Sequence, residues 1–289
     1  MVYKIPILIT VVAVALILVN LTTKEDFVNP LNGNYLQYLT SAKSPGYCAL
    51  KKSTLNNGVL RIFYPKGACG KDKTETCGIS AVAVYPDNLN PRRATLSADV
   101  LFETGFVFDG GKLGLGFEMG SAGATGGHAN STASSCRVIF KKGGSASCYI
   151  YVPLGSRQTD ANLIKLATGQ SVYGAEFFEA NFPEGSFKVG VKNRVKIGVK
   201  MNTPGRADGE CFMTINGTTM RKVGIMWLTS NVNEGITRLN HTSFVGGTWY
   251  SSRDNYLQMS NITLTDTFPV FQVNACNPTE FQYNLTTCK

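Results

Sequence analysis

"CRVIFKKGGSASCYIYV" (Cys136–Val152) consists of two short apolar runs joined by a segment that contains two glycines. Short β-branched or alternating runs predict strands, and a glycine turn between two of them predicts a β-hairpin. Successive side chains along a strand point to opposite faces. We therefore expect Ser135 and Arg137 to share one face of the first strand, and Tyr149 and Tyr151 to share one face of the second.

The two cysteines of this hairpin, Cys136 and Cys148, should then lie together on the opposite face. We expect a cross-strand disulfide between them, unless a bulge in the glycine turn shifts the register. Cys69 and Cys77 flank "GKDKTET" and are expected to clip a loop in the same way. The sequence leaves open how the other four cysteines pair, namely Cys48, Cys211, Cys276 and Cys288.

Similar short runs recur along the chain, broken by glycine and asparagine and by turns such as "ADGE". This spacing is typical of an all-β sandwich. Only 16% of the residues are charged and 30 are glycine, which disfavours a helical bundle or an acidic disordered chain. One stretch, 160–167, has a helical pattern. The expected strands are 58–64, 79–85, 94–102, 136–140, 148–152, 194–201 and 209–217.

The N-terminus carries an apolar run, 5–19, behind a single lysine. A full membrane span needs about 20 residues, so this run fits a signal peptide better, with an uncleaved signal anchor as the alternative. We expect a protein that is secreted or membrane-anchored, with membrane contact only through this segment. The predicted organisation is 1–23 signal peptide or anchor, 24–45 stalk or extension, 46–268 β domain and 269–289 a disulfide-pinned tail.

The formal charge of +9 favours an anionic partner: nucleic acid, an acidic membrane surface or an acidic polysaccharide. Eight cysteines without a C-x-x-C pair, and six N-x-[ST] sequons, agree with an oxidising secretory compartment of a eukaryote or its virus. Nucleic acid is scarce there, so we expect an acidic polysaccharide, bound by a monomer. The candidate glycosylation sites are Asn20, Asn130, Asn216, Asn240, Asn261 and Asn284.

A second stretch, "FDGGKLGLGFE" (Phe108–Glu118), surrounds one lysine with glycines. It is not a P-loop, because the first glycine of that motif would stand at Phe106 and Leu113 would have to be serine or threonine. A dinucleotide-binding fingerprint would need glycine or alanine at Met119. We interpret the stretch as a strand whose glycines let a broad ligand approach Lys112 closely.

Two cations and two phenols on one face suit the cleavage of a 4-linked uronic-acid polymer. Lys112 and Arg137 would neutralise the uronate carboxylate, so that the adjacent C5 proton becomes acidic enough to remove. A phenol can act as base or acid when cations depress its pKa, and lysine can do likewise. This chemistry requires no metal and no cofactor.

The residues also resemble a known family, polysaccharide lyase family 14, whose members are β-jelly-roll alginate and glucuronan lyases. The resemblance rests on "LSADVLF", "FDGGKLGLG", "TGGHA", "SCR" and "CYIYVP", which occur in the family's order. It continues in "DGECFMTINGTTM" and "TSFVGGTWYSSRDNYLQMSNITL" and spans about residues 58–265. The resemblance implies a jelly-roll β-sandwich and a polysaccharide lyase.

The resemblance also implies roles for single residues. The family's essential lysine falls on Lys112, its S-x-R pair on Ser135 and Arg137, and its Y-x-Y pair on Tyr149 and Tyr151. The cations would hold the uronate, the tyrosines would transfer protons and the serine would orient them.

Gly114 departs from the family's proline, which predicts a more mobile loop. Lys141 or Lys142 would replace a substrate-contacting arginine, and His128 would line a subsite.

Three functions remain open at this stage. The leading one is a lyase that cleaves alginate or glucuronan by β-elimination. The second is a non-catalytic jelly-roll protein that attaches a virus or a cell to a glycan, and the third is a structural envelope glycoprotein. The combination of Lys112, the S-x-R pair and the Y-x-Y pair favours the enzyme. The sequence does not specify the uronic acid, endo or exo cleavage, or which tyrosine is the base.

Overall fold

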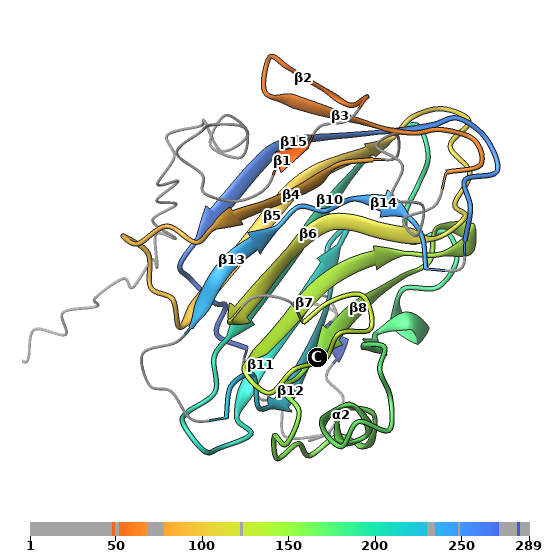
Figure 1. The fold of residues 1–289 in the computed structure, drawn as a ribbon. Helices are drawn as coiled ribbons and strands as arrows, with labels where there is room; N and C mark the ends of the chain where they lie inside the picture. Colours follow the sequence, from red (N-terminus) through yellow and green to blue (C-terminus); the bar gives the residue numbers. More distant parts are fainter. Residues whose placement is uncertain are drawn as a thin grey trace, which may run out of the picture.

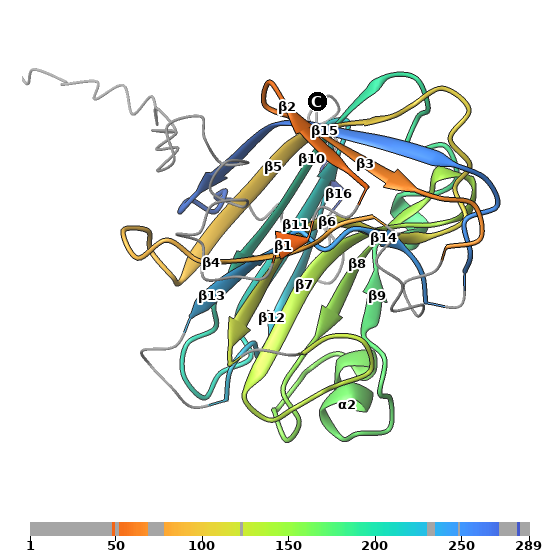
Figure 2. The same cartoon turned by 45° about the horizontal axis from the view of Figure 1, so that its top comes forward.

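The computed structural model describes residues 52–68, 78–121, 124–229, 235–247 and 249–271, together with the backbone of 48–49 and 282–283. The described strands form two antiparallel sheets that pack face to face (Figures 1 and 2). The predicted β-sandwich is confirmed. Its helical content is small: α2 (Ala161–Ala167) and two 3-10 turns, Lys142–Gly144 and Glu179–Asn181.

Within the described residues, each sheet has eight strands. In spatial order, the first sheet contains β1 (Cys48–Ala49), β4 (Ser80–Val84), β13 (Ile236–Asn240), β6 (Gly111–Gly120), β7 (Ala133–Phe140), β8 (Ala146–Tyr151) and β9 (Ala175–Phe177), and β14 (Phe244–Val245) pairs with β6. The second contains β16 (Gln282–Tyr283), β12 (Thr218–Ile225), β11 (Gly209–Ile215), β10 (Lys192–Lys200), β5 (Arg93–Phe102), β15 (Asn255–Thr265), β3 (Val59–Tyr64) and β2 (Thr54–Asn56).

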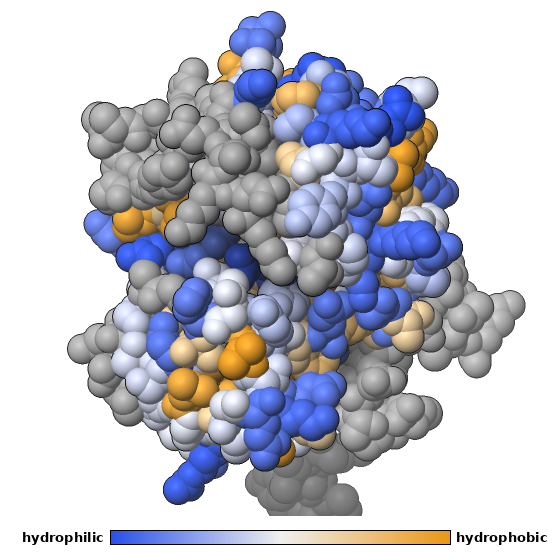
Figure 3. Space-filling model, turned by 45° about the vertical axis from the view of Figure 1, so that its right-hand side comes forward, coloured by the Kyte–Doolittle hydropathy of each residue, from blue (hydrophilic) through white to orange (hydrophobic). Residues whose placement is uncertain are grey.

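The core lies between the sheets and follows the alternation of the strands. Along β5 every second residue is buried, from Ala94 to Phe102. Phe102 packs against the rings of Phe106 and Phe140 at one end of the sandwich. On the side of the molecule that Figure 3 presents, hydrophilic side chains predominate and apolar ones form small separate groups. The apolar residues therefore hold the two sheets together.

The predicted hairpin is β7–β8, and its register matches the expectation. Ser135 lies opposite Tyr151, and Arg137 lies opposite Tyr149. Because one slip of register would reverse every side chain, this pairing puts all four on one face, away from the core. The polar face of the hairpin is thereby confirmed.

The expected Cys136–Cys148 disulfide is not present in the structure. Both side chains point into the core as expected, but Cys148 lies opposite Val138 rather than opposite Cys136. The two Sγ atoms are 3.3 Å apart, whereas a disulfide requires about 2.05 Å. Cys211 of the opposite sheet lies beside them, with the three Sγ atoms within 4.8 Å of one another. The sequence could not reveal this cluster of three thiols, because Cys211 comes from the other sheet.

Several predictions fall outside the described residues. These are the N-terminal segment and stalk, the disulfide-pinned tail, the loop clip of Cys69 and Cys77, and the sequons at Asn20 and Asn284. Within the described part of the chain, no helix is long and apolar enough to cross a membrane.

The prediction that Asn240 carries a glycan does not fit the folded protein. Asn240 is 3% exposed, and its Nδ2 donates a hydrogen bond of 2.6 Å to Glu118 Oε1. That leaves no room for a sugar on this side chain. Asn216 and Asn261 are exposed, each with a positive φ, and Asn130 is half-buried. These three remain candidates.

Gly114 does not lie in a loop as expected but in a bulge of β6, where the register with β7 shifts between Lys112 and Gly116. Its φ is +89°, and a Cβ there would come within 2.9 Å of the Ser243 Cβ and 3.1 Å of the His241 carbonyl oxygen. Proline holds φ near about −65°. The backbone of this chain at Gly114 is therefore incompatible with the proline that the resemblance would place there.

We predict that Gly114→Ala lowers the free energy of unfolding by more than the ~1–2 kcal/mol that a positive φ alone costs. The additional loss reflects the crowding by Ser243 and His241. Gly205→Ala is the matched control, since Gly205 has φ +74° and no atom lies within 4 Å of the place that its Cβ would take. Urea unfolding of both variants measures the difference, and equal losses would contradict the packing argument.

Candidate active site

Three of the candidate site residues meet on the outer face of the first sheet. Lys112 extends from β6 and places its Nζ 3.5 Å from the centre of the Tyr149 ring on β8. Arg137, on β7 between them, lies opposite Tyr149 on one side and Gly116 on the other. The structure thus brings together two cations and a phenol that come from three successive strands.

Two glycines make this close approach possible. A Cβ at Gly116 would lie 2.4 Å from Cγ of Arg137, so only glycine lets the arginine lie across β6. A Cβ at Gly174 would lie 2.9 Å from both Tyr149 and Tyr151, and the Gly174 N–H donates a 2.9 Å hydrogen bond to the Tyr149 hydroxyl. Gly116 belongs to the glycine-rich stretch noted in the sequence. Nothing in the sequence pointed to Gly174.

Arg137 is the most unusual group of the site. It is only 5% exposed, and among the described residues nothing accepts a hydrogen bond from its Nε or Nη2. Burial lowers the pKa of its guanidinium, while the carboxylate of Glu118 acts in the opposite direction. A buried charge with unused donors is costly unless an acceptor binds it. Both donor atoms are buried, so an anionic ligand that accepts these hydrogen bonds has to displace the groups that cover them.

Glu118 is a residue that the sequence did not single out. It lies on β6 opposite Ser135, is buried, and accepts the hydrogen bond from Asn240. Its Oε2 is 3.8 Å from Nη1 of Arg238. The carboxylate therefore offsets part of the positive charge beneath the site. It could not be recognised from sequence, because its partners come from the distant strand β13.

Burial changes the protonation of Lys112 and Tyr149. It lowers the pKa of Lys112 to about 7, with a further decrease from the charge of Arg137 and a partial increase from Glu176. It raises the pKa of Tyr149, as does the hydrogen bond with the Tyr151 hydroxyl at 3.4 Å. The expectation that nearby cations depress the pKa of the phenol is therefore wrong for Tyr149, because burial outweighs the charge of Arg137. Near neutral pH the Tyr149 phenol is protonated, and Lys112 lies near its midpoint.

Ser135 and Tyr151 are fully buried beneath the segment 124–130. Ser135 Oγ donates a 2.7 Å hydrogen bond to the Ala124 carbonyl, and the Gly127 N–H donates a 2.9 Å bond to the Tyr151 hydroxyl. Both side chains therefore hold this segment on the sheet. His128 lies on the same segment and is exposed.

The two candidate substrate lysines differ in their surroundings. Lys141 Nζ forms ion pairs with Glu176, at 2.9 Å, and with Glu179. Lys142 is exposed, and none of the ion pairs among the described residues includes it. Lys142 is thus the one of this pair whose charge is available to a ligand.

Among the described residues, the group with the geometry for a metal ion is the thiol cluster of Cys136, Cys148 and Cys211. These residues lie on the core side of the sheet, whereas Arg137 and Tyr149 lie on its outer side. The cluster is therefore separate from the site.

Comparison with known proteins gives a consistent picture. The family model "Polysaccharide lyase 14" matches residues 52–262. The crystal structure of alginate lyase vAL-1 from Chlorella virus superposes with a TM-score of 0.71 at 28% identity, covering 80% of this chain and 96% of that one. No curated protein matches the chain significantly.

Two further solved structures bear on the fold alone. The PL-14 alginate lyase from Aplysia kurodai has a TM-score of 0.61 at 22% identity, covering 73% of this chain and 85% of that one. A mutant of alginate lyase Aly36B in complex with alginate trisaccharide has a TM-score of 0.57 at 22% identity, covering 79% and 95%. The same sandwich is thus found in proteins that bind an acidic glycan.

We predict that Lys112 titrates near pH 7 and that Glu176→Gln lowers its pKa further. The carboxylate stabilises the ammonium, so its removal favours the neutral amine. NMR titration of protein with 13C-labelled lysine measures the pKa of Lys112. The variant Lys112→Arg assigns its signal, and exposed Lys196 serves as the internal control. An unchanged midpoint in Glu176→Gln would contradict the assigned electrostatics.

Proposed function

Since the chain belongs to the polysaccharide lyase 14 family and is thus a polysaccharide lyase, we propose that it cleaves a 4-linked uronic-acid polymer of the alginate or glucuronan type by β-elimination. The observation that supports this most is the buried guanidinium of Arg137, with two unused donors, beside Lys112 and Tyr149. We also propose that the protein acts as a monomer and is secreted or membrane-anchored, as its N-terminal segment suggests.

The carboxylate of the uronate is bound first. Arg137 offers Nε and Nη2, two donors in the fork geometry that suits a carboxylate. Lys112 adds a second positive charge on the neighbouring strand. Together they stabilise the negative charge that develops on the carboxylate when C5 loses its proton.

The proton transfer is then assigned to Tyr149, whose phenol is protonated near neutral pH. This hydroxyl gives its proton to O4 and takes up the proton from C5 in the same step, so it is both the acid and the base. A base removes the proton from C5, the C4–O4 bond breaks with its electron pair remaining on O4, and a double bond forms between C4 and C5. The departing O4 takes up a proton, so the step consumes no co-reactant. Tyr149 is 9% exposed and adjoins both cations, whereas Tyr151 is fully buried behind it. We assign the contact with the sugar to Tyr149 and the support of its hydroxyl to Tyr151.

Incubation with alginate, polyglucuronate and glycosaminoglycans tests the proposal, with absorbance of the unsaturated uronate as the readout. We expect turnover on at least one polymer, and loss of it in Lys112→Ala. Since Lys112 is charged below its pKa of about 7 and neutral above it, kcat/KM should fall as the pH rises through about 7. A rise over the same range would assign Lys112 as the base instead.

Absence of product on every polymer, together with measurable binding, would overturn the lyase reaction and support the glycan-attachment function. Absence of both product and binding would support a structural glycoprotein. Product analysis by mass spectrometry then identifies the uronic acid and distinguishes endo from exo cleavage.

The two tyrosines should respond differently to removal of their hydroxyl groups. Tyr149→Phe should lower kcat by about 10²–10⁴, the scale of one lost acid–base group. Tyr151→Phe should mainly lower the melting temperature, because the Gly127 N–H loses its acceptor. Tyr256→Phe, on the outer face of the second sheet, is the control for kcat and should leave it unchanged. Equal loss of kcat in both site variants would contradict the separation of roles.

A further inference from the structure

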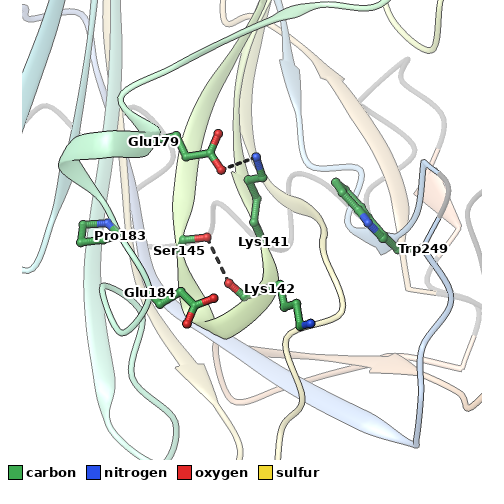
Figure 4. A pocket seen from close by; sticks show the side chains of 7 residues that line it. All are labelled: Lys141, Lys142, Ser145, Glu179, Pro183, Glu184 and Trp249. Carbon is green, nitrogen blue, oxygen red and sulfur yellow. Dashed lines mark hydrogen bonds and ion pairs between the residues drawn. The ribbon is translucent and has the colours of Figure 1, made fainter.

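Beside the active site, two adjoining hollows of about 360 and 630 Å³ share Lys142 and Trp249 in their linings. In Figure 4 the indole of Trp249 stands across the smaller hollow from Pro183, with Lys141 and Lys142 between them. The larger one is lined mainly by apolar side chains, including Phe108 and Tyr250. The hollows thus combine an apolar wall with an exposed cation.

Trp249 is 39% exposed, although burial of such a large apolar ring would be favourable. One side of its ring packs on the backbone of Gly110, where a Cβ would come within 2.7 Å of the indole. The segment after it is held to the segment before β6, since both the N–H and the Oγ of Ser252 donate to Asp109 Oδ2. The indole is thereby fixed with part of its surface open to the hollows.

The hollows lie next to the candidate site of Lys112, Arg137 and Tyr149. Gly110 lies immediately before β6 with φ +104°, two residues from Lys112, so the chain between them spans at most about 7 Å. Gly111 faces the core beside Phe140, so Lys112, the next residue of β6, lies toward the outer face. A polymer bound at Lys112 that continued along β6 toward Gly110 would meet Trp249 with its next units.

Of the two lysines that line the smaller hollow, Lys142 is the one that can bind an anion. Lys141 is engaged by Glu176 and Glu179, and the Asp109 carboxylate accepts hydrogen bonds from Ser252. The carboxylate of Glu184 lies against Gly143, at the edge of the smaller hollow, where it can accept hydrogen bonds from sugar hydroxyls.

We propose that Trp249 and Lys142 form a sugar-binding subsite next to the cleavage point. The C–H face of one sugar ring stacks on the indole, and Lys142 binds a carboxylate of the same chain. This inference rests on the proposed function for the identity of the ligand. It adds a residue, Trp249, that makes the enzyme prefer long chains to short ones.

Intrinsic fluorescence tests the contact directly. The chain has two tryptophans, and the other one, Trp227, is fully buried in the core. In the slow variant Tyr149→Phe, alginate and polyglucuronate oligosaccharides of graded length should shift the emission and protect it from acrylamide, beginning at the length that reaches the hollows. The double variant Tyr149→Phe/Trp249→Phe should show no shift, because only Trp227 remains. An equal shift in both would overturn the proposal.

Kinetics give the second test. Trp249→Ala should raise KM on the long polymer by roughly tenfold, the scale of one lost aromatic contact, and leave turnover of the shortest cleavable oligosaccharide unchanged. Trp249→Phe, which keeps a flat ring, should recover most of the loss. Lys142→Glu should raise KM most at low salt, whereas Lys196→Glu, an equal charge change on β10 of the other sheet, should not.

The outcomes separate this proposal from the proposed function. Normal KM on long chains in Trp249→Ala, with wild-type turnover intact, would overturn the subsite and leave the lyase. A Trp249 emission shift without any cleavage by the wild type would support the subsite and overturn the lyase reaction. A protein that shows neither would overturn both.

Discussion

The site depends on the placement of one charged group, the guanidinium of Arg137, on the outer face of a sheet where it is almost fully buried. Such a group destabilises the fold unless charge or hydrogen bonds offset it. Glu118 supplies part of the charge from the adjacent strand, and Gly116 supplies the space. The remaining donors stay unused by the described part of the protein. The fold therefore maintains an incomplete set of interactions, which the proposed anionic ligand would complete.

This placement also determines the state of its neighbours. Burial, together with the charge of Arg137, lowers the pKa of Lys112 to about 7. Only part of the Lys112 side chains therefore carry a positive charge at neutral pH. Burial and the Tyr151 hydroxyl keep Tyr149 protonated. A bound carboxylate would stabilise both cations at once. Binding and protonation are thus coupled through the same few groups.

Much of this arrangement follows from the sequence because strands have a period of two. The alternation in "CRVIFKKGGSASCYIYV" was sufficient to place Ser135, Arg137 and the two tyrosines on one face, and the glycine-rich stretch placed Lys112 near them. The same reasoning failed for the Cys136–Cys148 disulfide, since alternation gives the face of a residue but not its distance from a diagonal neighbour. Glu118, Gly174 and Trp249 could not be predicted, because their roles depend on pairing between strands and loops far apart in the chain.

Gly116 and Gly174 have a consequence for how such an enzyme can diversify. At either position any larger residue would collide with a side chain to which we assign a role in the reaction, so these two positions tolerate little variation in sequence. The residues at the edge of the site are not restricted in this way. His128, Lys142 and Trp249 project from connecting segments that contact solvent. Evolution of a new glycan preference, or its engineering, is therefore directed to the connections between strands, while the strands themselves preserve the reaction.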